Sequence, residues 1–386
     1  MPRILIYRDQ LLPYSETFIP AQVESLCHYE AFYGGSRRLN SILNQQETVV
    51  FDELSQFSRL WKGLYKVGGI VSPRWLTALR DYNPALVHAH FGSDGGLVAP
   101  ICKRLNIPLV VTFHGYDATC KTPQWTSVRN QGDFFRTLIL HKRDQALNQA
   151  HRIVAVSEFI RHQLLQRGAA AEKVLVHYIG IDRQRFSPTP MQRRPIVLFV
   201  GRLVEKKGVQ YLIQAMAQVQ RQHPGVELVI IGKGGMQPRL QNLANKLAVQ
   251  VQFLGQQPPE QVHHWMNRAQ IFCGPSIVAK SGDTEGFGMV FAEAQAMGLP
   301  VVSFATGGIP EAVIQGETGL LGPEKDTAQL AKNIRRLLED GALRDKFARA
   351  GQAHVAKNFD LHRNTRQLET VYDQVLSQHA AQASGQ

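Results

Sequence analysis

A glycine-rich turn followed by a run of helix-forming residues lies between Gly282 and Gly298. The stretch reads Gly-Asp-Thr-Glu-Gly-Phe-Gly-Met-Val-Phe-Ala-Glu-Ala-Gln-Ala-Met-Gly. A helix that begins near Gly288 leaves its first backbone N–H groups without partners, and the positive end of the helix dipole lies at the same place. A phosphate or diphosphate suits such a turn, and Gly286 lets it approach the backbone closely. The stretch therefore predicts an anion site.

Two carboxylates accompany this predicted anion site. Glu285 precedes the turn, and Glu293 lies eight residues after Glu285, about two helical turns along. A ligand with a phosphate in the middle and a polyhydroxylated group at each end would use both carboxylates. The alternative is a glycine-rich turn with an acidic residue before it and a glutamate on the helix surface, without any ligand.

The sequence around these two glutamates resembles the donor site of a known enzyme family. Glu-Gly-Phe-Gly-Met-Val-Phe-Ala-Glu-Ala is followed by Gly-Leu-Pro-Val-Val and then by Gly-Gly-Ile-Pro-Glu. The pattern resembles retaining glycosyltransferase family 4, the group 1 glycosyltransferases. The resemblance implies an α/β fold of the GT-B type, in which two Rossmann-like doubly wound domains face each other across a cleft.

The resemblance also implies a role for each residue of the stretch. Glu285 is expected to be catalytic and to hold the hexose of a nucleotide sugar, and Glu293 is expected to bind the ribose hydroxyls. The other expected contacts are those of Gly288, Met289 and Val290 with the diphosphate and those of Gly286 and Phe287 with the sugar.

Positive charges follow the first strand predicted in the second half of the chain. Residues 201–208 read Gly-Arg-Leu-Val-Glu-Lys-Lys-Gly. Arginine offers a planar fork to phosphate oxygens, and lysine offers a point charge. The element resembles the Gly-Arg-Leu…Lys-Gly element of the family, whose diphosphate-binding pair matches Arg202 and Lys207. Lys206 is expected to be a solvated neighbour, and the alternative for the whole segment is a charged loop without a ligand.

A second glycine-rich turn, Ile-Gly-Lys-Gly-Gly at residues 231–235, superficially suggests NAD binding. It lacks the full glycine spacing of a dinucleotide fingerprint and the acidic residue after the next strand. In the family this turn and the strand end at 253–255 lie near the nucleobase, so Lys233 and Leu254 are expected there. The Asp283-Thr-Glu285 segment suggests a metal, but the backbone amides already serve the diphosphate. The prediction is therefore a site with neither a metal nor a cofactor.

A histidine at the end of a predicted strand is the main candidate in the first half of the chain. Residues 111–117 read Val-Thr-Phe-His-Gly-Tyr-Asp. Family 4 enzymes carry a histidine in this Phe-His-Gly context, where it contacts the transferred sugar. His114 is therefore expected to be catalytic, and Tyr116 and Asp117 on the adjoining loop are candidates for contact with the acceptor.

Two earlier strand ends also carry polar residues. Ser15 and Glu16 lie in Ser-Glu-Thr-Phe-Ile, which is similar to family members that build exopolysaccharides of the colanic acid type, and they are candidates for acceptor contact. Ser15 or Thr17 could instead cap the following helix. His88 and His90 share one face of a strand, but no third ligand supports a metal site. We expect one of these two histidines to be buried and hydrogen-bonded and the other to line the cleft.

The length of the chain and its apolar runs predict two domains, because 386 residues exceed one ordinary domain. Continuous apolar runs indicate parallel strands that are buried on both faces. The predicted strands lie at residues 4–7, 86–90, 109–113, 153–156, 174–178, 196–200, 228–231, 251–254, 271–273 and 301–304. We expect an N-terminal acceptor domain at 1–190, a nucleotide-sugar donor domain at 191–360, and a C-terminal helix at 361–386 that returns to the first domain.

Composition narrows the class of protein. The 44% of hydrophobic and 19% of charged residues are typical of a soluble globular chain. Neither a signal peptide nor a membrane span is apparent, so a cytoplasmic location is expected. The scattered cysteines lack the spacing of a disulfide framework or a zinc site. The net charge of +12 is spread along the chain without a nucleic-acid-binding module, so phosphate ligands or a membrane face explain it better.

A stripe of apolar residues predicts an amphipathic helix near residues 57–66. Its apolar members are Phe57, Leu60, Trp61, Leu64 and Tyr65, and its basic flanks are Arg59, Lys62 and Lys66. Such a helix could lie in an anionic membrane interface, at the inner face of the plasma membrane. The alternative is packing of the stripe against the sheet of its own domain.

These inferences together predict a metal-independent retaining hexosyltransferase. It would move a hexose from a nucleoside diphosphate sugar, UDP-glucose or another UDP-hexose, to a hydroxyl of a saccharide or lipid-linked saccharide in exopolysaccharide biosynthesis. The alternatives are a non-catalytic scaffold that binds nucleotide sugars and a nucleotide-sugar epimerase of the same fold. The hexose, the base and the acceptor stay open.

Overall fold

The computed structural model describes residues 1–13, 16–39, 46–54, 58–123 and 131–384. The chain divides into two compact units. Unit 1 comprises Met1–Gly180 together with Leu361–Gln386, and unit 2 comprises Ile181–Asp360. The chain therefore leaves unit 1 shortly before the Pro-rich segment at 186–195, and its last helix belongs to unit 1.

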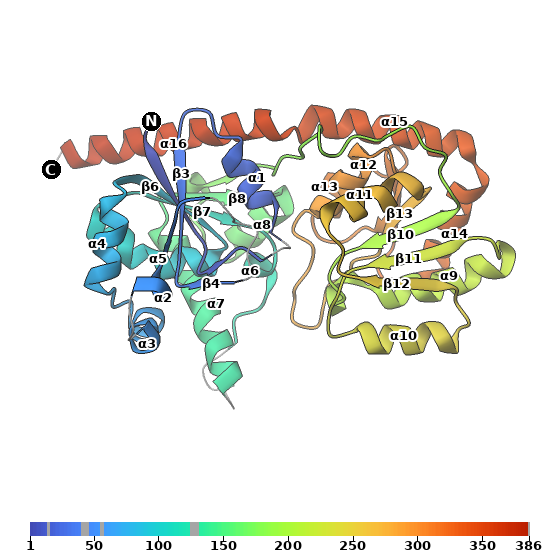
Figure 1. The fold of residues 1–386 in the computed structure, drawn as a ribbon, viewed down its shortest axis with the longest axis horizontal. Helices are drawn as coiled ribbons and strands as arrows, with labels where there is room; N and C mark the ends of the chain where they lie inside the picture. Colours follow the sequence, from blue (N-terminus) through green and yellow to red (C-terminus); the bar gives the residue numbers. More distant parts are fainter. Residues whose placement is uncertain (14–15, 40–45, 55–57, 124–130, 385–386) are drawn as a thin grey trace. The chain divides into compact units, whose positions relative to one another are not determined.

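A seven-stranded parallel sheet forms the centre of unit 1 (Figure 1). Its strands, in their order across the sheet, are β5 (Thr48–Val50), β3 (Glu30–Gly35), β1 (Arg3–Tyr7), β6 (Pro84–His90), β7 (Leu109–Phe113), β8 (Arg152–Ala155) and β9 (Val174–Val176). Two short strands, β2 (Gln10–Leu11) and β4 (Arg37–Arg38), form a separate parallel pair. Because the strands run parallel, their carboxyl ends meet at one edge of the sheet, where doubly wound folds bind ligands.

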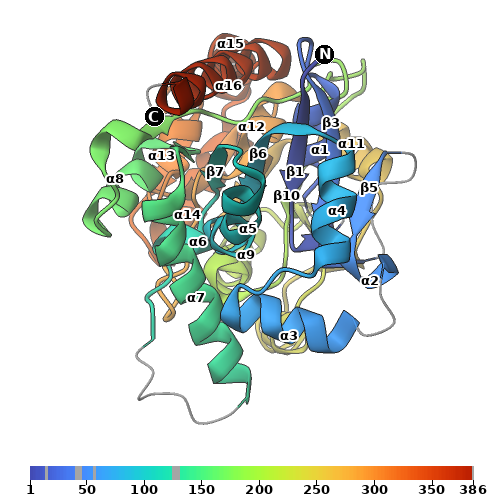
Figure 2. The same cartoon turned by 90° about the vertical axis from the view of Figure 1, so that its left-hand side faces the viewer.

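Helices connect the strands of unit 1. They are α1 (Phe18–Glu24), α2 (Phe51–Leu54), α3 (Ser58–Gly68), α4 (Pro73–Asp81), α5 (Gly92–Leu105), α6 (Tyr116–Thr119), α7 (Gln131–Gln149), α8 (Glu158–Gln166) and α16 (Leu361–Ser384). Helices α5 and α7 lie side by side (Figure 2) and approach closely, since a Cβ atom at Gly96 would lie 1.8 Å from the carbonyl oxygen of Lys142. Only glycine allows this approach.

The last helix, α16, is tied to unit 1 by buried polar contacts. One carboxylate oxygen of Glu369 accepts hydrogen bonds from the backbone N–H groups of Cys27 and His28, each at 2.7 Å. The hydroxyl of Tyr372 lies 2.7 Å from Nδ1 of His88 on β6. Tyr372 is also part of the apolar core that includes Ile4 and Ile6 of β1.

Unit 2 contains a six-stranded parallel sheet (Figure 1). In their order across the sheet, its strands are β12 (Val251–Gly255), β11 (Glu227–Ile231), β10 (Ile196–Val200), β13 (Ile271–Gly274), β14 (Val301–Phe304) and β15 (Gly319–Gly322). Its helices are α9 (Val209–Gln222), α10 (Gln237–Lys246), α11 (Pro259–Arg268), α12 (Met289–Ala296), α13 (Ile309–Ala312), α14 (Thr327–Glu339) and α15 (Gly341–Asn358), and a short 3-10 helix η3 spans Glu205–Lys207.

All ten strands predicted from apolar runs are confirmed, within one or two residues at their ends. The sequence missed β2, β3, β4, β5 and β15. Ser157 caps α8, since its hydroxyl accepts a hydrogen bond from the N–H of Ile160 at 3.1 Å. Thr17 precedes α1 but makes no capping hydrogen bond with its side chain.

Candidate active site

A buried ion pair lies at the carboxyl edge of the unit 2 sheet. Lys207, the last residue of η3, places its Nζ 2.6 Å from Oε2 of Glu285. The hydroxyl of Ser276 donates a longer hydrogen bond to the same oxygen, at 3.4 Å. Burial by itself raises the pKa of Glu285, but the charges of Lys207 and Lys206 outweigh it and lower that pKa to about 2. Glu285 is therefore an anion at any physiological pH.

Lys206 is buried, which corrects the expectation that it is a solvated neighbour. Only 7% of the residue is exposed, and its Nζ donates to Oδ1 of Asp283 at 2.9 Å and to the carbonyl oxygen of Thr284 at 3.4 Å. The backbone carbonyl of Lys206 also accepts from the N–H of Ile277 at 2.7 Å. Lys206 thus holds Asp283 and Thr284, the two residues that directly precede Glu285, in place.

Arg202 differs from both lysines because it is exposed. No hydrogen bond or ion pair of its guanidinium is found among the residues that the structure describes. Its charge nevertheless contributes to the lowered pKa of Glu285. Arg202 is therefore an unpaired cation close to the Lys207–Glu285 pair.

The glycine-rich turn after Glu285 ends at Gly288, and α12 begins at Met289. Gly288 has a φ of 87°, and a Cβ atom there would lie 2.4 Å from the ring of Phe291 and 3.2 Å from Cγ of Glu285. Glycine is therefore required, and the Glu285 side chain lies against the start of the helix. The N–H groups of Met289 and Val290 fall in the first turn of α12, where a helix supplies them with no acceptor.

The pair of glycines in the segment after β14 supports this turn. The N–H of Gly308 donates to the carbonyl oxygen of Glu285 at 2.9 Å. A Cβ atom at Gly308 would lie 2.0 Å from the carbonyl oxygen of Gly286. The Gly-Gly-Ile-Pro-Glu motif noted in the sequence therefore has a local structural task, which is to hold the Glu285 backbone.

Phe287 is placed differently from the other residues of the turn. Its side chain is 2% exposed, and its ring packs edge to face on Phe359 with centroids 4.9 Å apart. A sugar could therefore meet the backbone of Phe287, whereas the aromatic ring belongs to the core.

Glu293 lies half-buried on α12. Burial raises its pKa to about 7, although the charges of Arg185 and Lys207 lower it. Arg185 was not predicted from the sequence. It lies in a turn after Asp182, whose Oδ1 accepts from the N–H groups of Gln184 and Arg185 at 2.9 and 3.1 Å.

The two residues expected near the nucleobase lie at neighbouring strand ends in unit 2. Lys233 is exposed after β11, and Leu254 is half-buried in β12. The N–H of Gly232 donates to the carbonyl oxygen of Gly255 at 2.7 Å, and the Lys233 side chain passes 3.6 Å from where a Cβ atom of Gly255 would lie. The structure thus brings these two strand ends together.

His114 directly follows β7 in unit 1 and contacts three other rings. Its Nε2 lies 3.1 Å from Nδ1 of His90, at the end of β6. The rings of Phe18 and Phe91 approach it with centroid distances of 5.0 and 4.7 Å. Burial lowers the pKa of His114 to about 3, and the charges of His88 and Arg8 act in the same direction. His114 is therefore a neutral imidazole held among aromatic side chains.

Asp117 is fully buried, and its carboxylate accepts hydrogen bonds from three backbone N–H groups. The donors are Gly92 at 2.9 Å, His114 at 3.0 Å and Gly115 at 2.8 Å. This arrangement fixes the turn that carries His114 and leaves Asp117 no exposed surface toward an acceptor. Tyr116 is partly exposed, and its ring stacks on Phe91 at 5.5 Å.

Glu16 belongs to a buried charge cluster. Its two carboxylate oxygens accept from Nε and a terminal nitrogen of Arg8, both at 2.9 Å. Arg8 also donates to Asp94 at 2.7 Å and lies over the ring of Phe91 at 4.4 Å. Glu16 therefore anchors the segment before α1. Ser15 lies outside the described residues.

His88 and His90 are both buried, each with 1% exposure. His88 fits the expectation of a buried, hydrogen-bonded histidine, because its two ring nitrogens lie 2.7 Å from the hydroxyls of Tyr372 and Thr112. The other histidine was expected to line the cleft, but His90 is as buried as His88, and its ring stacks against that of His114.

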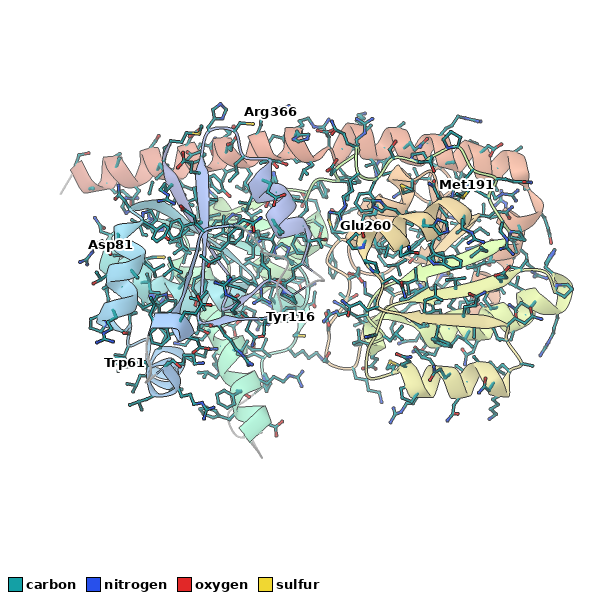
Figure 3. All side chains as sticks on the ribbon, viewed as in Figure 1. Trp61, Asp81, Tyr116, Met191, Glu260 and Arg366 are labelled. Carbon is teal, nitrogen blue, oxygen red and sulfur yellow. The ribbon has the colours of Figure 1, made fainter. Side chains whose placement is uncertain are left out.

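The residues of the predicted amphipathic stripe differ in their exposure to solvent. Tyr65 is buried, whereas Leu60 is 67% exposed and Leu64 and Val67 are also exposed. Trp61 projects from α3 and is half-buried (Figure 3). Phe57 lies outside the described residues. Within the described part of the chain, no helix is both long and apolar enough to span a bilayer.

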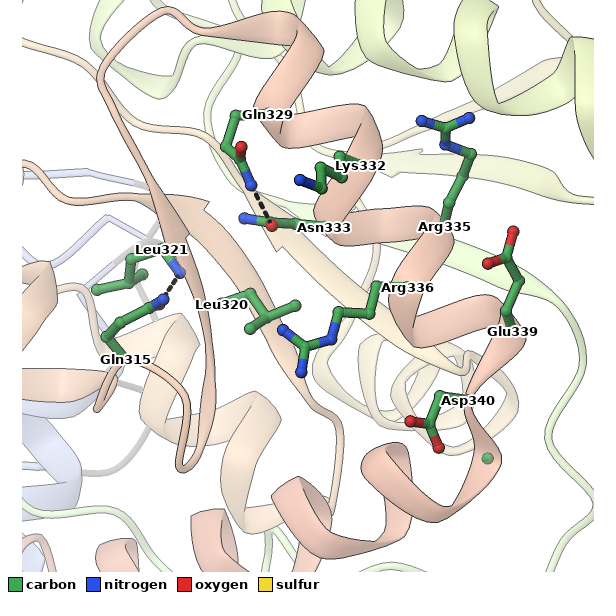
Figure 4. Close-up of a pocket in the computed structure, with 11 residues that line it drawn as sticks. Gln315, Leu320, Leu321, Gln329, Lys332, Asn333, Arg335, Arg336, Glu339 and Asp340 are labelled. Atoms are coloured by element: carbon green, nitrogen blue, oxygen red, sulfur yellow. Dashed lines mark hydrogen bonds between the residues drawn. The ribbon is translucent and has the colours of Figure 1, made fainter.

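A cavity of about 730 Å³ lies beside α14 in unit 2 (Figure 4). It is lined by Gln315, Leu320, Leu321, Gln329, Lys332, Asn333, Arg335, Arg336, Glu339, Asp340 and Gly341. None of the residues predicted for donor or acceptor contact is among them.

Comparison with solved structures defines the fold. Anabaena Alr3699/HepE in complex with UDP-glucose is similar to this chain with a TM-score of 0.76 and 20% identity, over 97% of this chain and 100% of that chain. Sucrose-phosphate synthase from Thermosynechococcus elongatus is similar with a TM-score of 0.76 and 21% identity, over 98% and 100% of the two chains. The predicted GT-B fold is thereby confirmed.

Sequence comparison defines the family. The model of group 1 glycosyl transferases matches residues 180–354, and that of Glycosyltransferase Family 4 matches residues 36–185. The amylovoran biosynthesis glycosyltransferase AmsK of Erwinia amylovora is 31% identical over 295 residues, which cover 74% of this chain and 69% of AmsK. The putative colanic acid biosynthesis glycosyltransferase WcaL of Escherichia coli K12 is 30% identical over 260 residues, 64% of this chain and 59% of WcaL. The chain belongs to glycosyltransferase family 4.

Proposed function

We propose that this glycosyltransferase moves a hexose from a UDP-hexose, with UDP-glucose as the first candidate, to a hydroxyl of a saccharide or lipid-linked saccharide during exopolysaccharide synthesis. The observation that carries the proposal is the Lys207–Glu285 pair at the start of α12, with the cation of Arg202 nearby. The names of AmsK and WcaL support the exopolysaccharide assignment, and the UDP-glucose complex of HepE supports the donor.

In this proposal the diphosphate binds at the start of α12. Lys207, Arg202 and the N–H groups of Met289 and Val290 stabilise the negative charge that develops on the diphosphate as the sugar leaves. Preorganised positive groups contribute most at such a place, because the charge they meet grows in the transition state. Glu293 accepts hydrogen bonds from the ribose hydroxyls, and Glu285 and His114 hold the hexose.

The transfer is proposed to retain the configuration at the anomeric carbon and to need no metal. The bond from that carbon to the diphosphate oxygen breaks, and a bond from the acceptor hydroxyl oxygen forms on the same face. The hydroxyl proton passes to the departing diphosphate. This front-face course needs no carboxylate nucleophile, which agrees with the pairing of Glu285 with Lys207.

Turnover with nucleotide sugars tests the proposed transfer. The purified protein is incubated with UDP-glucose, UDP-galactose and GDP-mannose in turn, and release of the nucleoside diphosphate is followed with and without a membrane extract as acceptor source. We expect slow release of UDP that the extract accelerates. Binding without any release would instead favour the non-catalytic scaffold, and interconversion of the UDP-hexoses would favour the epimerase.

We also propose that α3 contacts an anionic membrane at the inner face of the plasma membrane, where lipid-linked acceptors lie. Leu60, Leu64 and Val67 form an exposed apolar stripe, and Arg59 beside it is exposed. Two other basic residues of the helix are already paired, Lys62 with Asp52 at 2.6 Å and Lys66 with Asp9 at 2.6 Å. Apolar burial is therefore expected to contribute more to binding than charge does.

Liposome sedimentation tests this contact. Wild-type protein should pellet with anionic vesicles, and Leu60→Glu should abolish pelleting without unfolding the protein, since the side chain is exposed. Met191→Glu is the matched control, because Met191 is an exposed apolar residue of unit 2. Equal pelleting of the wild type and Leu60→Glu would contradict the contact.

A further inference from the structure

Two histidines at the ends of neighbouring strands form a hydrogen-bonded pair. Strand β6 ends at His90, and His114 directly follows β7. Nδ1 of His90 lies 3.1 Å from Nε2 of His114, and the ring planes are within 20° of each other. One of these two nitrogens must carry a proton and donate a hydrogen bond to the lone pair of the other.

The orientation of the His90 ring is fixed by its surroundings. His90 is 1% exposed, and its ring lies against that of His88 with centroids 4.4 Å apart. His88 cannot rotate freely, because both of its ring nitrogens are hydrogen-bonded, to Tyr372 on α16 and to Thr112 on β7. The position of His90 Nδ1 is therefore determined by buried contacts that do not involve His114.

The second nitrogen of His90 indicates where the proton lies. Nε2 of His90 is buried and has no hydrogen-bond partner among the residues that the structure describes. The other tautomer would bury an N–H group at Nε2 without an acceptor, and among backbone groups an unpaired buried N–H is rarer than an unpaired carbonyl. The proton of His90 is therefore placed on Nδ1, and Nε2 carries the lone pair.

The tautomer of His114 follows from that of His90. If Nδ1–H of His90 donates, then Nε2 of His114 accepts, and the neutral ring of His114 carries its own proton on Nδ1. Burial keeps both rings neutral over the working pH range, since it lowers the pKa of each. His114 then offers a hydrogen-bond donor through Nδ1.

We propose that His90 is a positioning residue, which holds His114 in the tautomer whose Nδ1–H donates to a hydroxyl oxygen of the transferred hexose. The inference rests on the proposed function, in which His114 contacts that hexose. It adds that Nδ1 of His114 makes the contact, that this atom is the hydrogen-bond donor, and that His90 determines both.

Nitrogen NMR of the wild-type protein tests the tautomer without any activity measurement. With ¹⁵N-labelled histidine, two-bond correlations distinguish protonated from unprotonated ring nitrogens, and His114→Gln assigns the His114 signals by their loss. We expect a protonated Nδ1 and an unprotonated Nε2 in His114. The opposite pattern would overturn the proposal.

Two substitutions at His90 test the positioning role. His90→Phe keeps a ring but removes the donor, and kcat/KM for transfer should fall about tenfold, the size of one lost hydrogen bond. Affinity for bare UDP should stay unchanged, because UDP has no hexose. His90→Asn restores an amide donor near the Nδ1 position and should recover most of the lost rate.

Tyr29→Phe is the matched control, since it removes a hydrogen bond to Asp373 on α16 but leaves the hydrogen bonds of His88, His90 and His114 in place. It should lower stability without changing kcat/KM. Wild-type turnover and an unchanged His114 tautomer in His90→Phe would overturn the proposal. If His90→Phe does not fold, the proposal is tested by the nitrogen NMR spectra of the wild type and by kcat/KM of His90→Asn. Unchanged kcat/KM in His114→Gln would instead refute the role of His114 in the proposed function.

Discussion

Lys207 and Glu285 lie 78 positions apart in the sequence, and their side chains form a 2.6 Å ion pair in which both are largely buried. The two residues were expected to hold different parts of one donor, the diphosphate and the hexose. Their pairing means that Glu285 already engages one donor of the Lys207 ammonium group. The ammonium group carries three N–H donors, so a diphosphate oxygen can bind Lys207 beside Glu285 or in its place.

The first prediction is that Glu285→Gln separates nucleotide binding from transfer. Without the carboxylate, Lys207 is freed from a competing anion, so UDP should bind at least as tightly as to the wild type. Transfer should fall about tenfold or more, because a charged hydrogen bond to the hexose is lost. Calorimetry with UDP and a transfer assay measure the two effects, with the exposed Glu317→Gln as control. Weaker UDP binding would show that Glu285 presents Lys207 to the diphosphate.

The second prediction concerns the two cations proposed to bind the diphosphate. Arg202→Ala and Lys207→Ala should each weaken UDP binding by about 1.5–3 kcal/mol, the value of a hydrogen bond to a charged group. Lys246→Ala removes an exposed lysine from the end of α10 and should have no effect. The measurement is calorimetric titration at fixed ionic strength. Wild-type affinity in both variants would place the diphosphate elsewhere.

The third prediction is a pH dependence that arises from Glu293, whose pKa burial raises to about 7. A protonated carboxyl group is a poorer acceptor for ribose hydroxyls, so binding should weaken as the pH falls through 7. Between pH 8 and pH 6 the dissociation constant for UDP should rise about tenfold, as for a group that must lose its proton to bind. UDP titrates in the same range, so the comparison is with Glu293→Gln. Equal pH profiles for the two proteins would contradict the prediction.

The fourth prediction concerns Lys206 as a buried structural cation. Lys206→Met removes one partner of the pair with Asp283 and should lower the free energy of unfolding by about 3 kcal/mol, as expected when a largely buried charge loses its partner. Urea denaturation measures this change. Lys332→Ala, at an exposed lysine of α14, is the control. A loss of UDP affinity without a loss of stability would mean that Lys206 binds ligand directly.

The sequence by itself determined the features that depend on neighbouring residues. Strands buried on both faces require continuous apolar runs, so β1, β6, β7 and the central strands of unit 2 could be located from pattern alone. Strand β3 reads Glu-Ala-Phe-Tyr-Gly-Gly and β15 reads Gly-Leu-Leu-Gly, and neither contains a long apolar run. These strands form because adjacent strands supply their hydrogen bonds, which no local pattern records.

The glycine-rich turn after Glu285 was likewise located from its own residues, since a positive φ at Gly288 and a helix start at Met289 follow from a local glycine and its neighbours. Only the tertiary structure decided which side chains are buried and with which partners. Lys206 and Lys207 are adjacent and chemically identical, yet one meets Asp283 and the other meets Glu285. The pairing of His90 with His114 depends in the same way on two strands that lie next to each other in the sheet. Such contacts join distant parts of the chain, and their geometry exists only once the sheet has formed.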